Sequence, residues 1–221
     1  MTSTIPSVVI LISGSGSNLQ AIIDASQTGR CPINITAVIS NRPNVEGLER
    51  AQKAGIAAAV IDHKQFTGRE DFDQSLIKQI DAYQPDLVVL AGFMRILTSE
   101  FVEHYAGKLL NIHPALLPDF PGLNTHERAI ESGVQQHGAS VHFVTTEVDG
   151  GPIVLQARVP VHRDDTTEQL AARVLKQEHL IYPLVIKWFA EKRLLLDNNE
   201  VFLDQQKLPK TGLNYAQVKE N

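Results

Sequence analysis

The amino-acid sequence predicts an α/β fold: an open, mostly parallel, twisted sheet with helices on both faces and an appended antiparallel hairpin. In the first half of the chain, short runs rich in β-branched residues alternate with segments of helical periodicity. This is the pattern of parallel strands joined by crossover helices. In the second half, apolar runs on either side of a glycine-containing loop indicate the hairpin.

The first half alternates expected strands with expected helices. The expected strands are Val8–Ile12, Ile35–Ile39, Ala57–Ile61, Leu87–Leu90 and Leu109–Ile112. The expected helices are Leu19–Ala25, Gly47–Ala54, Asp71–Ala82 and Ser99–Tyr105. Gly55 follows the second of these helices, where glycine commonly ends a helix, and Pro85 ends the loop before a strand of nearly continuous apolar character. Both features support a parallel sheet covered by helices.

The second half predicts a hairpin followed by a long helix. The hairpin pairs Ser140–Thr146 with Ile153–Val161 through the turn Asp149-Gly150-Gly151-Pro152. Apolar side chains then recur on one face between Thr167 and Ala190, which predicts the helix.

Residues 194–209 are expected to form a small terminal hairpin around Asp197-Asn198-Asn199, which are turn-forming residues. No linker, repeat or low-complexity block interrupts the chain. We therefore predict one domain over residues 1–221, with a first half to residue 105 and a second half from residue 106.

Composition narrows the class of protein. A chain of 221 residues buries roughly 70 to 75% of its unfolded surface, which is enough for a sizeable core. The formal net charge is −5, so nucleic acid and anionic membranes are not expected partners, and an anionic substrate would need local donors. Cys31 is the only cysteine, which excludes an intrachain disulfide and a thiolate zinc cage.

The start of the chain shows no targeting pattern. Met1–Pro6 carries no positively charged side chain ahead of the apolar run Val8–Ile12, and that run is too short for a signal or spanning segment. We expect a cytoplasmic protein, and the single cysteine fits a reducing compartment.

A glycine-rich loop, Ser13–Asn18, follows the first strand and precedes a helix. Its backbone N–H groups and the helix N-terminus can hold a phosphate. Leu19 stands where a dinucleotide-binding fingerprint needs glycine or alanine, and the later acidic residue is missing, so NAD binding is disfavoured. Two interpretations stay open: a phosphate-binding loop, or a tight turn in which Ser17 or Asn18 caps the helix.

Asn111 and His113 form the most informative pair in the sequence. They lie two positions apart at the end of an apolar strand, so both side chains point to one face. Pro114 stops further pairing and leaves them at the strand's carboxyl end, where open α/β sheets place their ligand crevice. Histidine suits acid–base work near neutrality, which makes His113 a candidate catalytic residue.

Asp149 has two interpretations. It belongs to an Asp-Gly-Gly-Pro loop, where aspartate commonly serves turn geometry. If it lay near His113, its carboxylate would favour the imidazolium and fix the tautomer. The other histidines suggest ordinary roles: His126-Glu127 does not begin a zinc motif because Ile130 replaces the second histidine, and His142 and His179 fit core or surface positions.

Several motifs follow one another in a specific order: Ile12–Gln20, Leu90–Leu97, Asn111–Pro114 with Leu116–Pro118, and Asp149–Pro152. From about Val8 to the terminal hairpin the chain resembles the phosphoribosylglycinamide formyltransferases, a family of folate-dependent enzymes of purine synthesis. The resemblance implies a Rossmann-like formyltransferase fold. It also implies transfer of the formyl group of 10-formyltetrahydrofolate to the amino group of glycinamide ribonucleotide.

The resemblance assigns binding residues. It implies that the ribonucleotide is bound by Gly16, Ser17, Asn18 and Glu178. It implies that the folate is bound by Arg69, Met94, Arg95, Ile96, Leu97 and Asn111. Taken alone, Arg69 and Glu178 would pass for solvated helix residues.

The resemblance also implies a catalytic group of Asn111, His113 and Asp149. Asn111 would donate to the oxyanion, and one such donor typically contributes about 2.7 to 4 kcal/mol in the transition state. His113 would supply a proton to the departing folate nitrogen, and Asp149 would support the imidazolium and help a water remove the amine's proton. No metal and no NAD are expected, the partners are small molecules, and the protein would be a monomer or a homodimer.

Other functions remain as alternatives. Methionyl-tRNA formyltransferase and formyltetrahydrofolate deformylase share the Asn-x-His and Asp core. The first usually carries an added C-terminal domain to hold RNA, whereas this acidic chain ends at Asn221; the second usually carries an N-terminal regulatory domain, whereas the first strand here begins within ten residues of Met1. A non-catalytic binding module on the same fold is a third alternative, and the joint presence of Asn111, His113 and Asp149 argues against it.

Overall fold

The computed structural model describes residues 5–218, so the expectation for the first residues of the chain, Met1–Thr4, lies outside the described part. The chain divides into two compact units, Met1–Asn111 and Ile112–Asn221. Each unit is described by itself below. That the whole chain forms one functional domain stays a prediction.

The first unit is built on a parallel sheet. Its strands are β1 (Ser7–Ile12), β2 (Asn34–Ser40), β3 (Ala57–Val60), β4 (Leu87–Leu90) and β5 (Leu109–His113), the last of which continues into the second unit. They lie in the order β3-β2-β1-β4-β5, and every pair is parallel. The predicted strands are confirmed, with ends that shift by one residue or so.

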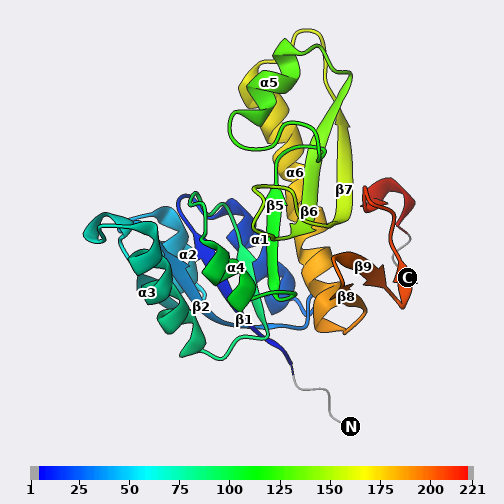
Figure 1. Ribbon diagram of the computed structural model, residues 1–221. Helices are drawn as coiled ribbons and strands as arrows, with labels where there is room; N and C mark the ends of the chain where they lie inside the picture. The colour runs from blue at the N-terminus through cyan, green and yellow to red at the C-terminus, as the bar shows by residue number, and fades with distance from the viewer. Residues whose placement is uncertain (1–4, 219–221) are drawn as a thin grey trace. The chain divides into compact units, whose positions relative to one another are not determined.

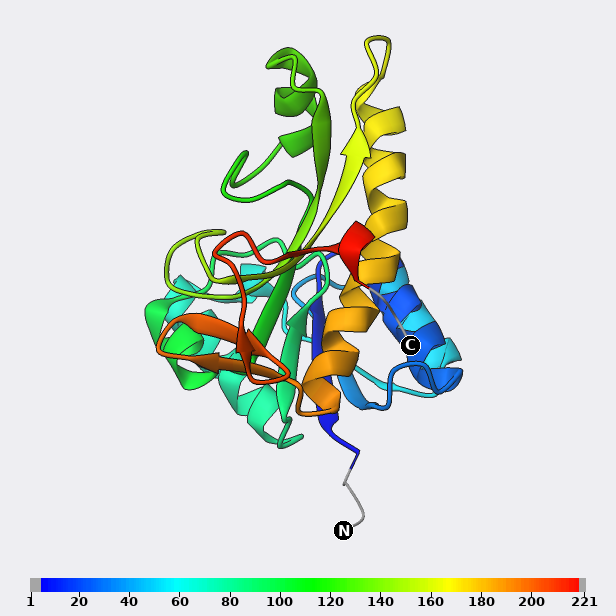
Figure 2. The same ribbon diagram turned by 90° about the vertical axis from the view of Figure 1, so that its right-hand side faces the viewer.

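The helices of this unit cover both faces of the sheet. They are α1 (Ser17–Gln27), α2 (Glu46–Lys53), α3 (Arg69–Asp81) and α4 (Ser99–His104), with a short 3₁₀ turn at His63–Gln65. α1 and α2 pack together on one face, and α3 and α4 on the other (Figures 1 and 2). Because both faces are covered, Val8–Ile12 of β1 is fully buried, which explains its unbroken apolar sequence.

The strand order reverses direction between β1 and β4, because the chain winds outward through β2 and β3 and then returns to β4. In open α/β sheets, ligands bind beyond the carboxyl ends of the strands at such a switch point. The loops that follow β1 and β4 are therefore the natural binding segments of this unit. They contain the glycine-rich loop and Met94–Leu97.

The second unit contains the predicted hairpin and the long helix. β6 (Gln136–Phe143) is antiparallel to β7 (Ile153–Pro160), and β11 (Leu213–Asn214) adds to β7 in parallel. α6 (Thr167–Ala190) packs against both β6 and β7 (Figure 2), and α5 (Thr125–Glu131) packs against α6. α6 has the bounds predicted from the sequence, and Thr166 with Gln169 forms a capping box at its start.

The first hairpin strand departs from the prediction. β6 begins at Gln136, four residues before the expected Ser140, and ends at Phe143. Gly138 has weak strand propensity, but it lies so close to the Ala157 carbonyl that any larger side chain would overlap it. The register shifts between Val141 and His142, and the segment from Val144 leaves the ladder despite its β-branched residues.

The terminal hairpin is confirmed with an added strand. β8 (Leu194–Asp197) and β9 (Glu200–Leu203) are antiparallel, and β10 (Gln206–Lys207) joins β9 on its other side. Asn198 and Asn199 connect the first two strands with φ of 47° and 62°. Positive φ at both central residues is the requirement of a two-residue hairpin turn, and asparagine meets it. A 3₁₀ turn, Tyr215–Gln217, follows β11.

Candidate active site

The glycine-rich loop leads directly into α1. Gly16 adopts a left-handed backbone with φ of 71°, and its carbonyl accepts a hydrogen bond from the Gln20 amide at 2.9 Å. Within the described residues no side chain caps α1, so the expectation that Ser17 or Asn18 caps it is wrong. Ser17 is already the first helical residue, which places both side chains inside the first turn rather than before it.

The loop after β4 is fixed to neighbouring segments of the first unit. The Met94 amide donates to Ser13 Oγ at 2.7 Å, which joins this loop to the end of β1. The Thr98 amide donates to Asp73 Oδ2 on α3 at 2.6 Å. Between these two bonds Met94 and Ile96 are 61% and 58% exposed. The loop thus offers apolar side chains to solvent from a fixed backbone, which suits a flat aromatic ligand.

Charged residues of α3 lie beside the same loop. Burial raises the pKa of Asp73, while the Thr98 hydrogen bonds and the charges of Arg95 and Arg69 act in the opposite direction. Arg95 places its guanidinium 5.7 Å from the centre of the Phe72 ring. Arg69 is the first residue of α3 and is exposed, as expected for a solvated helix start. The predicted folate residues Arg69 and Met94–Leu97 therefore belong to one region of the first unit.

β5 carries the Asn111 and His113 pair. Asn111 is half-buried and lies opposite Leu90 of β4 in the parallel ladder. His113, two positions later on the same strand, is only 5% exposed. Both side chains lie on the same face of the strand, as the sequence pattern predicts.

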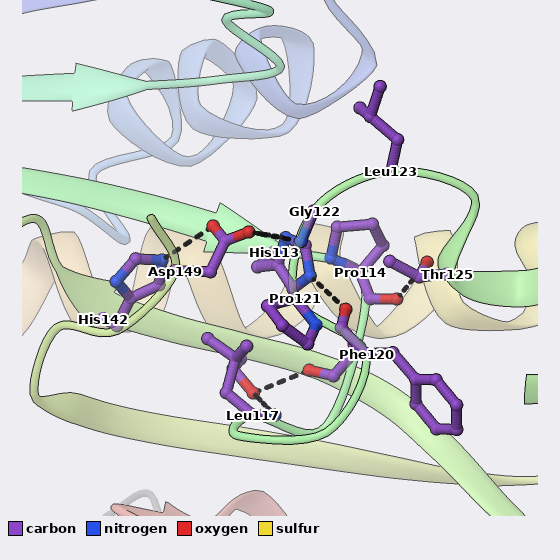
Figure 3. A network of polar contacts seen from close by, with 12 residues as sticks. His113, Pro114, Leu117, Phe120, Pro121, Gly122, Leu123, Thr125, His142 and Asp149 are labelled. Carbon is purple, nitrogen blue, oxygen red and sulfur yellow. Dashed lines mark hydrogen bonds and ion pairs between the residues drawn. The ribbon is translucent and has the colours of Figure 1, made fainter. Parts of the chain in front are cut away.

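His113 contacts two acceptors at once (Figure 3). Its Nε2 lies 2.9 Å from the Phe120 carbonyl oxygen, and its Nδ1 lies 3.4 Å from Asp149 Oδ2. A carbonyl can only accept, so Nε2 carries a proton in this arrangement. Nδ1 then faces a carboxylate, so each ring nitrogen of His113 lies next to an acceptor.

Asp149 combines the two interpretations that the sequence left open. It adopts a left-handed backbone with φ of 53°, as a turn residue does, and Gly151 behind it lies so close to the Phe143 carbonyl that a side chain would overlap it. At the same time its Oδ2 accepts the Gly122 amide at 2.8 Å and faces His113. The tight turn is what brings the carboxylate to the imidazole.

His142 is a site residue that sequence reasoning missed. Its side chain is 2% exposed, and its Nε2 lies 3.9 Å from Asp149 Oδ1 (Figure 3). Its Nδ1 donates to the Phe143 carbonyl at 2.9 Å. Burial lowers the pKa of His142, so the ring is neutral at pH 7. The available signal was strand alternation: Ser140 and His142 are two positions apart, so both point to the face that carries the polar contacts.

Buried polar groups hold the segment that follows His113. Ser140 Oγ donates to the Ala115 carbonyl at 2.7 Å and accepts the Leu117 amide at 3.0 Å. Gln156 Nε2 donates to the Leu117 carbonyl at 2.8 Å and to Ser140 Oγ at 2.9 Å. These bonds fix the backbone beyond Pro114, because each group would otherwise be buried without a partner.

A second layer of rings lies next to His113. His137 meets Phe120 and His126 edge-on, with ring centres 5.8 and 5.2 Å apart. Burial lowers the pKa of His137 to about 4, and the neighbouring His126 adds to this effect. Burial also lowers the pKa of His126. Both rings are neutral at pH 7, and they pack in a cluster with the Phe120 ring.

Glu178 differs from the expectation for an isolated helix residue. It lies on α6 and is only 7% exposed, so it is not a solvated surface glutamate. Fully buried glutamates are uncommon in proteins, so the burial of Glu178 is compatible with its predicted role as a binding residue. Periodicity alone could not distinguish it from the polar residues of the outer face.

Residues 5–218 contain neither a metal-binding cluster nor a membrane-spanning helix. No group of three or more His, Cys, Asp or Glu side chains in this part of the chain is arranged to hold a metal ion. Across the same residues, no helix combines the length and the apolar character needed to span a membrane.

Comparison with known proteins places the chain in a family. The formyl transferase family model matches residues 7–186. The chain belongs to the formyl transferase family. It is 57% identical to the phosphoribosylglycinamide formyltransferase of Escherichia coli over 93% of this chain and 97% of that protein. The corresponding enzyme of Haemophilus influenzae is 51% identical over the same shares. A solved phosphoribosylglycinamide formyltransferase from Coxiella burnetii superposes with a TM-score of 0.92 at 52% identity, covering 96% of this chain and all of that one.

The ring cluster predicts a stability that depends on pH. Because the pKa of His137 is about 4 in the folded protein against 6.5 ordinarily, the unfolded chain binds more protons between these values. The free energy of unfolding should therefore fall as pH drops from about 6.5 to 4, by up to about 3 kcal/mol from this residue. In His137→Phe this fall should be smaller by about 2 kcal/mol, measured by urea unfolding at pH 7, 6, 5 and 4.5.

His162→Gln, at an exposed histidine, is the matched control and should follow the wild-type pH dependence. If His137→Phe showed the same acid sensitivity as the wild type, burial of His137 would not be its cause.

Proposed function

We propose that this protein transfers the formyl group of 10-formyltetrahydrofolate to the amino group of glycinamide ribonucleotide. The products are N-formylglycinamide ribonucleotide and tetrahydrofolate. The likeness to phosphoribosylglycinamide formyltransferases along almost the whole chain carries this proposal. The contact of His113 with Asp149 supports it, because it supplies the acid–base pair that the reaction needs.

The reaction begins with attack of the substrate amine on the formyl carbon. The carbonyl π bond opens, and the oxygen takes up negative charge. We assign Asn111 to this oxygen, because an amide N–H at the carboxyl end of β5 can donate to it. A single donor of this kind contributes about 2.7 to 4 kcal/mol to the transition state.

Collapse of the intermediate breaks the bond between the formyl carbon and the folate nitrogen. The C=O bond re-forms, and that nitrogen takes a proton from the His113 imidazolium. The attacking amine loses a proton through a water that Asp149 orients, and this proton restores the imidazolium of His113. Both ring nitrogens of His113 already have partners, so one contact must be exchanged when the proton is delivered. We expect the hydrogen bond to the Phe120 carbonyl to be the one that breaks, because its acceptor is neutral and the bond is therefore weaker than one to a carboxylate.

His142 completes the surroundings of Asp149. As a neutral ring it adds no second positive charge, so the carboxylate acts mainly on His113. Asp149 is also fixed by the Gly122 amide, which restricts its rotation. We assign Asn111, His113 and Asp149 as the catalytic residues and His142 as a positioning residue.

The ribonucleotide would be held by the loop before α1 and by Glu178. Gly16, Ser17 and Asn18 stand at the N-terminus of an 11-residue helix, where backbone N–H groups favour a phosphate. Glu178 would accept hydrogen bonds from ribose hydroxyls, a role suited to a buried carboxylate.

The folate would be held by Met94, Arg95, Ile96 and Leu97, with Arg69 and Asn111. Backbone groups of the fixed loop could pair with the polar edge of a pterin, while the exposed side chains of Met94 and Ile96 would contact its faces. Arg69 would pair with a carboxylate of the folate tail.

The remaining assignments follow from the proposed activity. The protein would act in the cytoplasm on small-molecule substrates, as a monomer or a homodimer, without nucleic acid, metal or NAD. The whole chain, residues 1–221, would form one catalytic domain.

The activity can be tested with purified protein and 10-formyltetrahydrofolate. Tetrahydrofolate should form only when glycinamide ribonucleotide is present, with one formyl group transferred for each folate consumed. Formate release without the ribonucleotide would instead identify a deformylase. Tight binding of both ligands without turnover would identify a binding module.

Asn111→Ala and His113→Ala should each lower kcat by on the order of 10² or more, because each removes a group that acts in the transition state. Steady-state kinetics of the purified variants, with circular dichroism as a check on folding, measures this. Turnover near the wild-type value in either variant would contradict its catalytic role.

Asp149→Asn should remove or displace an ionisation in the pH profile of kcat, because the neutral amide no longer supports the imidazolium of His113. The Gly122 amide can still donate to the amide oxygen, so the turn should persist. An unchanged pH profile would mean that Asp149 serves the turn alone.

A further inference from the structure

The start of α2 packs directly behind the glycine-rich loop. A Cβ added to Gly16 would lie 2.8 Å from Gly47 Cα, and one added to Gly47 would lie 3.4 Å from Gly16 Cα. A Cβ on Gly47 would also lie 2.5 Å from Ile12 Cδ1 and 3.0 Å from the Gly14 carbonyl oxygen, so neither position has room for a side chain and the two backbones pack closely. We propose that Gly47 and Arg50 of α2 are positioning residues that hold this loop in its phosphate-binding shape. This inference rests on the proposed function.

The first anchor is a backbone bond. The Gly47 amide donates to the Gly14 carbonyl at 3.1 Å. In a trans peptide the carbonyl of one residue and the N–H of the next point in opposite directions. Because the Gly14 carbonyl points at α2, the Ser15 N–H points away from α2.

The second anchor is the Arg50 side chain. Its Nε donates to the Ser15 carbonyl at 2.8 Å. By the same geometry, the Gly16 N–H also points away from α2. Two successive N–H groups on one side of a loop, at the start of a helix, form a concave anion site. α2 thus fixes two consecutive peptide planes of the loop from behind.

Arginine suits this task because it reaches several groups at fixed angles. Besides Ser15, its Nη1 lies 3.3 Å from Gln20 Oε1 on α1, and its Nη2 lies 2.6 Å from Glu46 Oε1 on α2. The guanidinium therefore ties the loop to both helices. Its pairing with Glu46 largely offsets its charge, so its contribution is mainly geometric.

The key variant is Arg50→Met, which keeps an apolar stem and removes every one of these bonds. It should raise KM for glycinamide ribonucleotide about tenfold. This is the loss of affinity expected when one hydrogen bond to the charged phosphate is no longer well oriented. KM for the folate and kcat should stay within about twofold, because those depend on other residues. Arg50→Lys should recover part of the loss, since a lysine can reach the Ser15 carbonyl but not all three groups.

A substrate without the phosphate gives the decisive readout. With glycinamide ribonucleoside, which lacks the phosphate, Arg50→Met and the wild type should have the same kcat/KM. Lys53→Met is the matched control, because Lys53 lies on the same helix, is 80% exposed and has only a distant ion pair with Glu49. It should leave both substrates unaffected. If Arg50→Met lowered kcat/KM equally for both substrates, its role would be general stability and the proposal would be overturned.

Binding of inorganic phosphate separates this inference from the proposed function. Titration calorimetry should show weak phosphate binding to the wild type and to Lys53→Met, and at least about tenfold weaker binding to Arg50→Met. This readout needs no turnover, so it stands even if the formyl-transfer assay fails. Phosphate binding that is absent from the wild type, or equal in Arg50→Met, would overturn the role of Arg50.

Discussion

The arrangement of polar groups in the second unit depends on the need to stabilise the partly buried carboxylate of Asp149. This side chain is 12% exposed, and a charge so withdrawn from water is costly unless other groups stabilise it. Its contacts come from separate segments: the Gly122 amide, His113 at the end of β5, and His142 at the end of β6. The tight turn after β6 supplies the carboxylate, and the segments that carry Gly122 and His113 supply the N–H groups that face it.

The two histidines near this carboxylate are not equivalent. His142 is the more deeply buried, its pKa is lowered by burial, and it donates from Nδ1 to a backbone carbonyl, so it is a neutral ring that brings no positive charge to the carboxylate. His113 has an acceptor at each nitrogen, and its Nδ1 lies closer to the carboxylate than Nε2 of His142 does. The two imidazoles therefore meet the same carboxylate in different ways. Their backbones and burial produce this difference, since the residue type is the same.

The parts of the structure that could be predicted are those that a short stretch of sequence determines by itself. The buried strands follow from apolar runs, α6 from apolar side chains that recur on one face, and the shared face of Asn111 and His113 from strand alternation. α5 was missed because it begins after Asn124, which adopts a left-handed backbone and makes no side-chain cap bond. The burial of Glu178 and the meeting of His113 with Asp149 depend on tertiary packing, which periodicity does not encode. The Arg50 contact is hidden for another reason: its partner is the Ser15 carbonyl, and a main-chain group leaves no trace in residue identity.

The net charge of −5 sets the terms for any anionic ligand of this chain. The protein as a whole repels such a ligand, so attraction must come from groups that act over a few ångströms. Backbone N–H groups at the start of α1 meet this requirement, because their partial charges are fixed in direction and carry no counter-ion cost. An arginine placed behind the loop and paired with Glu46 orients those groups without adding a strong positive field. Under the proposed function, the first unit would recognise the phosphate through peptide orientation, and the absence of a side chain at Gly16 and Gly47 lets α2 pack against the loop whose peptide planes it fixes.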